Sequence, residues 1–269
     1  MSRVISSFSN PLIKNVLLLG EKPRARKEQN RIIIEGLREI RLAIASSFTL
    51  TDLFFTPEFV SDAELRSLVP SAGNVEVVEV TKEVFNRMAY RNDRDGLIAL
   101  AEPKRLDFSD LKLRKTPLLL VLETVEKPGN LGALLRTADA ANLDAVIICD
   151  PQTDIYNPNA IRSSIGCIFT MPVVTASSEE TIAWMCQSGI RMFGTALTAT
   201  QWYHETDFRQ PAAIIMGSEA NGLSSAWLEG AGELIKIPMM GKIDSMNVSA
   251  SAAIVIFEAM RQRGFRMEV

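Results

Sequence analysis

Polar side chains able to bind a ligand or stabilise charge follow three of the most apolar stretches of this sequence. They are Asn130, Glu219, Ser245 and Asn247, and each lies in a turn that follows a run expected to form a buried strand. Because the carboxyl ends of parallel strands meet at one edge of a sheet, we expect these three turns to converge. Such an edge is where α/β proteins bind their ligands.

The third of these turns lies near the end of the chain. The segment 234–237 is apolar and is followed by Pro238, which cannot donate to a sheet and therefore ends a short strand. Asp244 and Ser245 are typical helix-capping residues, and the small apolar residues of 250–260 predict a helix that packs closely. An ordinary strand-to-helix connection also explains this stretch when it is read alone.

Arg136 adds a cation near the first turn. It lies about one and a half to two helical turns beyond Asn130 in a helix expected over 133–141, so both side chains can project toward one loop mouth. A helical arginine is usually a solvated surface residue. The small and apolar neighbours Leu134, Leu135 and Ala138 favour a more specific position.

The glycines around Asn130 also suggest a different ligand. Gly129 and Gly132 follow a strand, and Asp150 lies about 20 residues further on, as in dinucleotide-binding proteins. The third glycine of that fingerprint is missing, so a dinucleotide-dependent oxidoreductase is the weaker interpretation.

Length and composition predict a globular α/β protein. The 269 residues, 47% of them hydrophobic, suffice for one large or two modest domains. No run of eighteen apolar residues and no apolar leader is seen, so we expect no membrane contact and a cytoplasmic protein. Cys149, Cys167 and Cys186 lack metal-ligand spacing and are predicted to be reduced core thiols, with no metal site. His204, the single histidine, is expected to decorate a loop.

Charge is unevenly distributed along the chain. Residues 1–116 carry 19 Lys and Arg against 16 Asp and Glu, whereas residues 117–269 carry 10 against 16. A positive first part beside a negative second part is compatible with a nucleic-acid-binding module next to a small-molecule site. We therefore expect a small α/β domain over 1–104, a linker over 105–116 and a second domain over 117–269.

Basic residues of the first domain gather near the mouth of its first strand and at the end of a later helix. Those proposed to contact nucleic-acid phosphates are Arg24, Arg26, Lys27, Arg87 and Arg91. A simple solvated face is the alternative explanation for this cluster.

Three motifs, taken together, resemble those of the SpoU, or TrmH-like, RNA 2′-O-ribose methyltransferases. They are P-G-N-L-G-A-L-L-R-T-A at 128–138, I-M-G-S-E-A-N-G-L-S at 215–224 and I-P-M-M-G-K-I-D-S-M-N-V-S-A-S-A-A-I at 237–254. The resemblance covers residues 117–269, and residues 1–104 look like the substrate-binding domain that many members carry. It implies a parallel-sheet methyltransferase domain with a deep trefoil knot, a homodimer, and S-adenosylmethionine as the cofactor.

The resemblance also assigns roles to individual residues. The catalytic or site-shaping positions are Asn130, Arg136, Glu219, Ser245 and Asn247. The cofactor-binding positions are Gly217, Ile237 and Met246, bordered by Thr195, Ala196 and Leu197. Met246 departs from the leucine that is common in the family at this point, and it is expected to fill the same apolar wall.

The implied reaction transfers a methyl group to a ribose 2′-hydroxyl of a structured ribosomal or transfer RNA. Arg136 is a poor base because a guanidinium stays protonated, so we expect it to hold the target phosphate and stabilise developing negative charge. A non-catalytic RNA-binding protein is the main alternative. It would not need all five of the polar residues named above.

Overall fold

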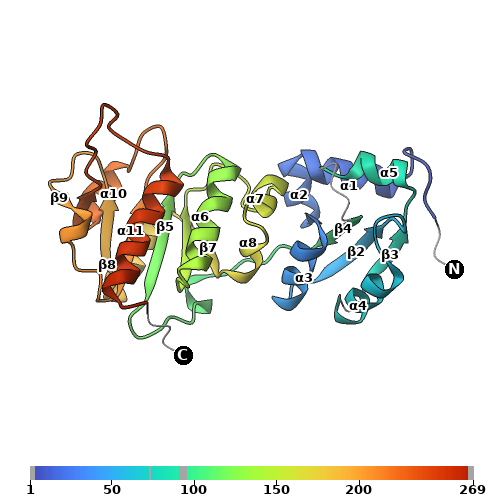
Figure 1. Cartoon of the computed structure of the whole chain (residues 1–269), viewed down its shortest axis with the longest axis horizontal. Helices are drawn as coiled ribbons and strands as arrows, with labels where there is room; N and C mark the ends of the chain where they lie inside the picture. The colour runs from blue at the N-terminus through green and yellow to red at the C-terminus, as the bar shows by residue number, and fades with distance from the viewer. Residues whose placement is uncertain (1–3, 73, 91–95, 266–269) are drawn as a thin grey trace. The chain divides into compact units, whose positions relative to one another are not determined.

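The computed structural model describes residues 4–72, 74–90 and 96–265, which form two compact units (Figure 1). The first unit consists of residues 1–104 and 156–170, and the second of residues 105–155 and 171–269. Each unit has its own sheet and its own hydrophobic core.

The second unit is built on a seven-stranded sheet with the order β7-β6-β5-β10-β8-β11-β9. Every pairing in it is parallel, as the near-continuous apolar runs predicted. The strands are β5 (Leu118–Glu123), β6 (Ala145–Cys149), β7 (Val173–Ala176), β8 (Arg191–Thr195), β9 (Gln201–Trp202), β10 (Ala212–Met216) and β11 (Glu233–Lys236). The trefoil knot stays a prediction.

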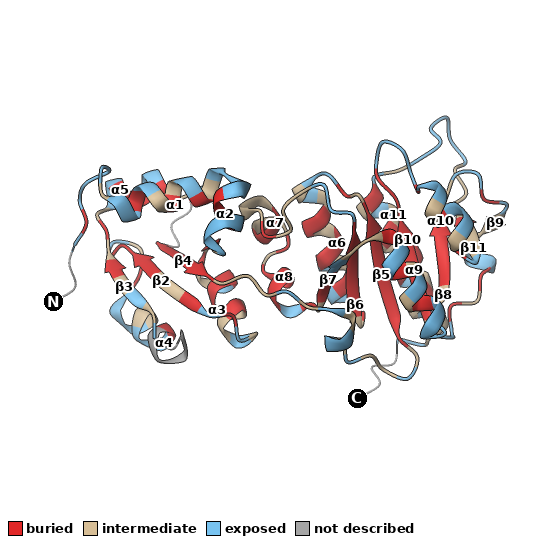
Figure 2. Ribbon diagram, turned by 180° about the vertical axis from the view of Figure 1, so that it is seen from behind, coloured by how far each residue is buried: buried red, intermediate tan, exposed pale blue. Residues whose placement is uncertain are grey.

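Helices cover this sheet and explain why its central strands are buried on both faces (Figure 2). Helices α6 (Pro128–Ala140) and α11 (Val248–Gln262) pack side by side, and α9 (Ser178–Gln187) packs with α10 (Ser225–Gly230). Two single turns, η1 (Phe108–Asp110) and η2 (Tyr203–Glu205), complete the unit, and η2 holds His204.

Two polar side chains, Asp144 and Arg263, hold the ends of strands and of α11 in the second unit. The Asp144 side chain, only 1% exposed, accepts bonds from Arg114 Nη2 at 2.7 Å and from the Leu118 amide at 2.8 Å. Burial alone would raise the pKa of Asp144, but the bonds from Arg114 and from the backbone outweigh it and hold that pKa below its usual value. At the end of α11, the Arg263 guanidinium donates to carbonyls of Thr116 and Gln210, just before β5 and β10.

The first unit contains a four-stranded mixed sheet with the order β1-β4-β2-β3. Its strands are β1 (Ile32–Glu35), β2 (Leu50–Phe55), β3 (Glu76–Glu79) and β4 (Leu97–Ala101). Its helices are α1 (Pro11–Glu21), α2 (Pro23–Gln29), α3 (Leu37–Ala45), α4 (Asp62–Ala72), α5 (Lys82–Met88), α7 (Pro158–Ser163) and α8 (Cys167–Thr170). The α/β character expected for residues 1–104 is confirmed.

The first unit includes a segment from the middle of the second predicted domain. Residues 156–170 lie between β6 and β7 in the sequence, and they pack against β1 and α3. Phe48 packs edge-on against Phe169 at 5.0 Å between ring centroids, and Gly166 lies so close to Leu42 that a Cβ there would be 2.6 Å from its Cδ1. Apolar contacts therefore give this segment to the first unit.

Residues 105–116, expected to be a linker, pack on the second unit. Leu106 forms a parallel bridge with Val174 beside the edge strand β7, and Phe108 stacks on Trp184 with ring centroids 4.5 Å apart. Leu111 and Leu113 also pack against the core of this unit.

The cysteines only partly follow the prediction. Cys149 and Cys167 are buried, and burial raises the pKa of Cys149 to about 12 despite its bond to Thr181. The expectation was wrong for Cys186, which is exposed because it lies on the outer face of the amphipathic helix α9.

Candidate active site

The three predicted turns meet at the carboxyl edge of the parallel sheet. Asn130 lies in the first turn of α6 after β5, Glu219 lies in the turn after β10, and Asn247 is the N-cap of α11 after β11. Strands β5 and β10 are neighbours, and β8 separates β10 from β11. Parallel pairing therefore brings the turns together, as expected from the sequence.

A chain of side-chain hydrogen bonds joins the three turns. Asn130 Nδ2 donates to Glu219 Oε1, and Asn130 Oδ1 accepts from Asn247 Nδ2 at 3.2 Å. Asn130 thus uses both ends of its amide, one toward each of the other turns. Glu219 lies 89 positions from Asn130 in the sequence, and Asn247 lies 117 positions from it.

Asn247 has a second task, because it also caps α11. Its Oδ1 accepts from the backbone amide of Ser249 at 3.0 Å and from the Ser249 hydroxyl. The same side chain therefore fixes the start of α11 and the position of Asn130. Its bond to Asn130 brings the N-termini of α6 and α11 near one another, and together they favour negative charge at this edge.

The turn that carries Glu219 is tightly closed. Ser218 and Gly222 exchange two backbone hydrogen bonds of 3.0 Å, and Gly222 has a φ of +67°. A Cβ at Gly217 would lie 2.2 Å from the Gly222 carbonyl carbon and 2.3 Å from its oxygen, so only glycine fits there. This close contact holds the turn in a shape that leaves Glu219 exposed.

Glu123 is a buried acid beside this edge that the sequence reasoning missed. It ends β5, it is 3% exposed, and its Oε2 accepts from the Ser224 amide at 2.8 Å, just beyond the Glu219 turn. Its Oε1 lies 3.4 Å from the hydroxyl of Ser178, which accepts a bond from Trp227 Nε1 at 2.9 Å. The available signal was an acid at the end of a fully buried strand, because a carboxylate there needs partners.

Arg136 and Ser245 are not joined to this chain of bonds. Arg136 is exposed on α6, and no hydrogen bond or ion pair links it to any other residue that the structure describes. Ser245 is also exposed, and its hydroxyl donates to Asp244 Oδ1 at 3.1 Å. Both side chains are accessible to a ligand.

The predicted cofactor positions lie at or beyond the ends of three neighbouring strands of the same sheet. Thr195 is the last residue of β8 and is followed by Ala196 and Leu197, Gly217 follows β10, and Ile237 and Met246 follow β11. The Thr195 hydroxyl donates to the Ile215 carbonyl at 2.9 Å, which ties the β8 loop to β10.

Apolar side chains stand exposed in two of these loops. Leu197 is 61% exposed, Ile243 is 67% exposed and Met240 is 94% exposed. Exposed apolar groups beside closely packed backbone suit a ligand with a flat apolar ring, such as adenine.

The basic residues of the first unit have unequal positions. Arg24, Lys27 and Arg87 are exposed, although Arg24 pairs with Glu28 at 2.6 Å. Arg26 is only 4% exposed and donates to the Leu19 carbonyl at 2.6 Å, so it closes the end of α1 and is not available to a phosphate. Arg91 lies outside the described residues.

Among the described residues, no three His, Cys, Asp or Glu side chains lie together in a way that could hold a metal ion. Within those same residues, no helix is both long enough and apolar enough to cross a membrane.

Comparison with protein families gives two matches. Residues 117–257 match the SpoU rRNA methylase family, and residues 10–99 match an MRM3-like substrate binding domain. Together they cover both units of the fold.

Individual relatives agree with these matches. The chain is 35% identical over 195 residues to the 23S rRNA (guanosine-2′-O-)-methyltransferase RlmB of Vibrio parahaemolyticus, covering 70% of this chain and 79% of the relative. A solved RNA 2′-O ribose methyltransferase is 37% identical, with a TM-score of 0.83 and coverage of 97% of this chain and 99% of the other. An AdoMet-bound rRNA methyltransferase from Sinorhizobium meliloti is 26% identical, with a TM-score of 0.89 and coverage of 97% and 98%.

The contact at Gly217 generates a testable prediction. Gly217→Ala should lower the free energy of unfolding by about 1–3 kcal/mol, because its Cβ overlaps backbone atoms that cannot turn aside. The matched control is Gly232→Ala, since nothing lies within 4 Å of a Cβ at that position. Urea unfolding of the two variants measures the difference, and equal stabilities would show that the Glu219 turn can relax.

Proposed function

This chain belongs to the SpoU rRNA methylase family, and from that membership we propose that it methylates one ribose in the RNA of the large ribosomal subunit. It is an S-adenosylmethionine-dependent RNA 2′-O-methyltransferase. The observation that carries the proposal is the Asn130 amide, which joins the Glu219 turn and the α11 cap at the edge where the cofactor loops end. The choice of ribosomal RNA is supported by the names of the relatives.

The loops fit the cofactor. Thr195, Gly217 and Ile237 would hold it with backbone groups, and the exposed Leu197 would cover an apolar part of it. When bound, S-adenosylmethionine supplies an electrophilic methyl group on a sulfonium.

The residues at this edge would position the ribose and stabilise charge. Asn130 and Asn247 keep the loops in fixed positions, so that a 2′-hydroxyl can be aligned without further ordering. The N-termini of α6 and α11 favour the negative charge that develops on the 2′-oxygen. Glu219 orients Asn130, and the exposed Ser245 would contact the substrate.

Arg136 is proposed to hold the phosphate next to the target ribose. A guanidinium does not act as a base at ordinary pH, so a phosphate oxygen held by Arg136 is proposed to accept the 2′-hydroxyl proton. A planar guanidinium can donate two parallel bonds to a phosphate, which an ammonium group cannot do.

The two alternative functions explain less of the structure. A dinucleotide-binding protein would use Asp150 for a ribose, but Asp150 Oδ2 accepts from the Ser178 amide at 3.1 Å and from its hydroxyl at 2.7 Å, at the start of α9. A non-catalytic RNA-binding protein would have no use for the bonded residues Asn130, Glu219 and Asn247.

Removal of the Arg136 guanidinium tests its proposed role. Arg136→Ala should lower methyl transfer about 10²–10³-fold, as expected for loss of one charge-stabilising donor, and Arg136→Lys should restore only part of it. Affinity for S-adenosylmethionine should stay unchanged, because its proposed contacts come from other loops. Radiolabelled methyl transfer to ribosomal RNA from cells that lack the gene, with calorimetric cofactor titration, measures both quantities.

An exposed arginine of the same unit provides the control for this experiment. Arg209→Ala removes a guanidinium that pairs with Asp207 at 2.8 Å, and it should change neither rate nor cofactor affinity. Parental activity of Arg136→Ala would exclude the catalytic role, whereas loss of cofactor binding would make Arg136 a structural residue.

Arg24, Lys27 and Arg87 of the first unit are proposed to contact RNA phosphates. The double variant Arg24→Gln, Lys27→Gln should bind ribosomal RNA more weakly, and its plot of log affinity against log salt should be shallower by about 1.4–1.8. Arg66→Gln is the control, since Arg66 is 81% exposed and pairs only weakly with Asp62 at 3.5 Å. An unchanged salt slope in the double variant would assign these cations to a solvated face.

A homodimer is proposed for the second unit, supported by the resemblance to the family and by Phe257, which is 41% exposed on α11. Light scattering at micromolar concentration should give about twice the mass of one chain. A monomer mass would overturn the dimer and leave the assignment of the cofactor loops untouched.

The cytoplasm is the proposed compartment because ribosomal RNA is the proposed substrate, and cell fractionation tests it.

A further inference from the structure

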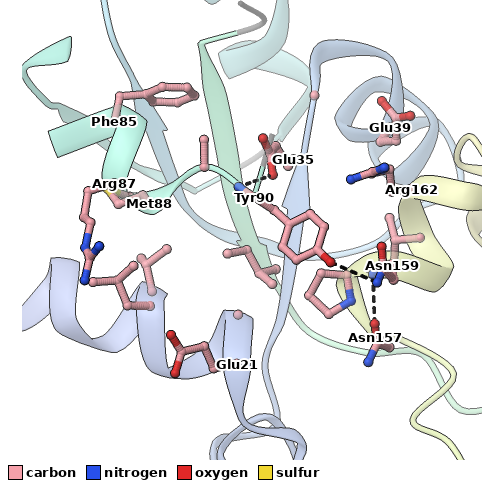
Figure 3. A pocket seen from close by; sticks show the side chains of 18 of the residues that line it. Glu21, Glu35, Glu39, Phe85, Arg87, Met88, Tyr90, Asn157, Asn159 and Arg162 are labelled. Atoms are coloured by element: carbon pink, nitrogen blue, oxygen red, sulfur yellow. Dashed lines mark hydrogen bonds between the residues drawn. The ribbon is translucent and has the colours of Figure 1, made fainter. Parts of the chain in front are cut away.

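The first unit contains a cavity of about 390 Å³ that the proposed methyl-transfer site does not use (Figure 3). Its walls come from α1, α5, α7 and the junction of β1 with α3, all within the first unit. The volume lies in the range of small-molecule pockets, which is roughly 300–1,000 Å³.

Apolar side chains, Phe85 among them, and the ring of Tyr90 form much of the lining. Val16, Ile33, Phe85 and Met88 are buried, and they give the cavity an apolar wall. Tyr90 differs from them, since it is 58% exposed and its ring stands in the middle of the lining. An aromatic ring exposed at a cavity is available for stacking.

The Tyr90 ring is held in place by three separate contacts. Its backbone amide donates to Glu35 Oε2 at 2.9 Å, and its hydroxyl accepts from Asn159 Nδ2 at 3.0 Å. The Arg162 guanidinium carbon lies 5.4 Å from the ring centroid. An exposed side chain that is fixed in this way loses little conformational entropy when a ligand stacks on it.

Glu39 offers a hydrogen-bond acceptor at the same cavity. It is 7% exposed, and among the described residues its one hydrogen bond or ion pair is a long contact of 3.5 Å to Arg38 Nη2. A buried carboxylate needs strong donors, and a contact of this length supplies little. A ligand with N–H groups would satisfy it.

The charges around the cavity select the part of a nucleotide that can enter. Three carboxylates, Glu21, Glu35 and Glu39, face two guanidinium groups, Arg87 and Arg162. A phosphate inside would be repelled by the carboxylates, whereas Arg87 is exposed and can hold one at the opening.

We propose that this cavity binds one unstacked base of the RNA substrate, stacked on Tyr90, with its donor edge toward Glu39. The proposal rests on the proposed RNA function of the chain. Single-stranded RNA is read in this manner, by aromatic stacking together with hydrogen bonds to base edges. Guanine is the base that fits best, because its N1–H and N2–H donors are adjacent and match the two oxygens of one carboxylate.

The experiment uses the full-length protein and three fluorescent uridine heptamers whose central residue is guanosine, adenosine or uridine. Fluorescence anisotropy without cofactor should show the guanosine heptamer bound about tenfold more tightly than the other two. Tyr90→Ala should weaken binding of that heptamer at least about fivefold, the lower end expected for loss of one stacked base. Tyr90→Phe keeps the ring and should bind within about twofold of the parental protein.

Two further variants separate base recognition from structural effects. Glu39→Gln should reduce the preference for guanosine, because an amide presents only one acceptor oxygen. Phe8→Ala removes an exposed aromatic side chain of the same unit that does not line the cavity, and it should bind all three heptamers as the parental protein does.

Three results would overturn the proposal. They are equal binding of the three heptamers by the parental protein, parental affinity in Tyr90→Ala, or a loss in Tyr90→Phe as large as that in Tyr90→Ala. These measurements need no methyl transfer, so they stand apart from the proposed function. Methylation of ribosomal RNA without base preference in the heptamers would defeat this inference alone. Base preference without methylation would defeat only the proposed function.

Discussion

The active-site edge depends on one side-chain amide. Asn130 donates to Glu219 and accepts from Asn247, and so it holds together turns that are 89 and 117 residues away in the sequence. An amide can do both because it carries an NH₂ donor and a carbonyl acceptor. An aspartate would repel Glu219, and a leucine would leave two polar partners without a bond. The position of the three turns is therefore tied to the chemistry of one residue.

The scaffold brings that amide to its partners. Helices α6 and α11 pack together on one face of the sheet, and each begins at this edge. Arg263 fixes the far end of α11 to carbonyls just before β5 and β10, while Asn247 fixes its near end. With both ends held, α11 cannot slide along α6, so the bond between Asn247 and Asn130 is kept in register.

The sequence predicted those features that follow from local patterns. Apolar runs followed by polar turns indicated the parallel strands and the convergence of Asn130, Glu219 and Asn247. It did not predict the burial of Arg26, because the carbonyls that accept bonds from its Nη1 are brought near only by the end of α1. Nor did it predict that residues 156–170 pack with the first unit, since an apolar segment does not specify which of two cores receives it.

Local positive charge explains how the acidic domain of residues 117–269 can be proposed to act on RNA. Residues 117–269 carry six more acidic than basic side chains, so their mean field repels RNA. Attraction must then be local, and two sources are present. The N-termini of α6 and α11 converge where the 2′-oxygen is proposed to become negative, and Arg136 stands exposed on α6. Glu219 lies at the same edge, bonded to Asn130, so a phosphate placed near it meets repulsion, and this charge pattern favours one alignment of the substrate.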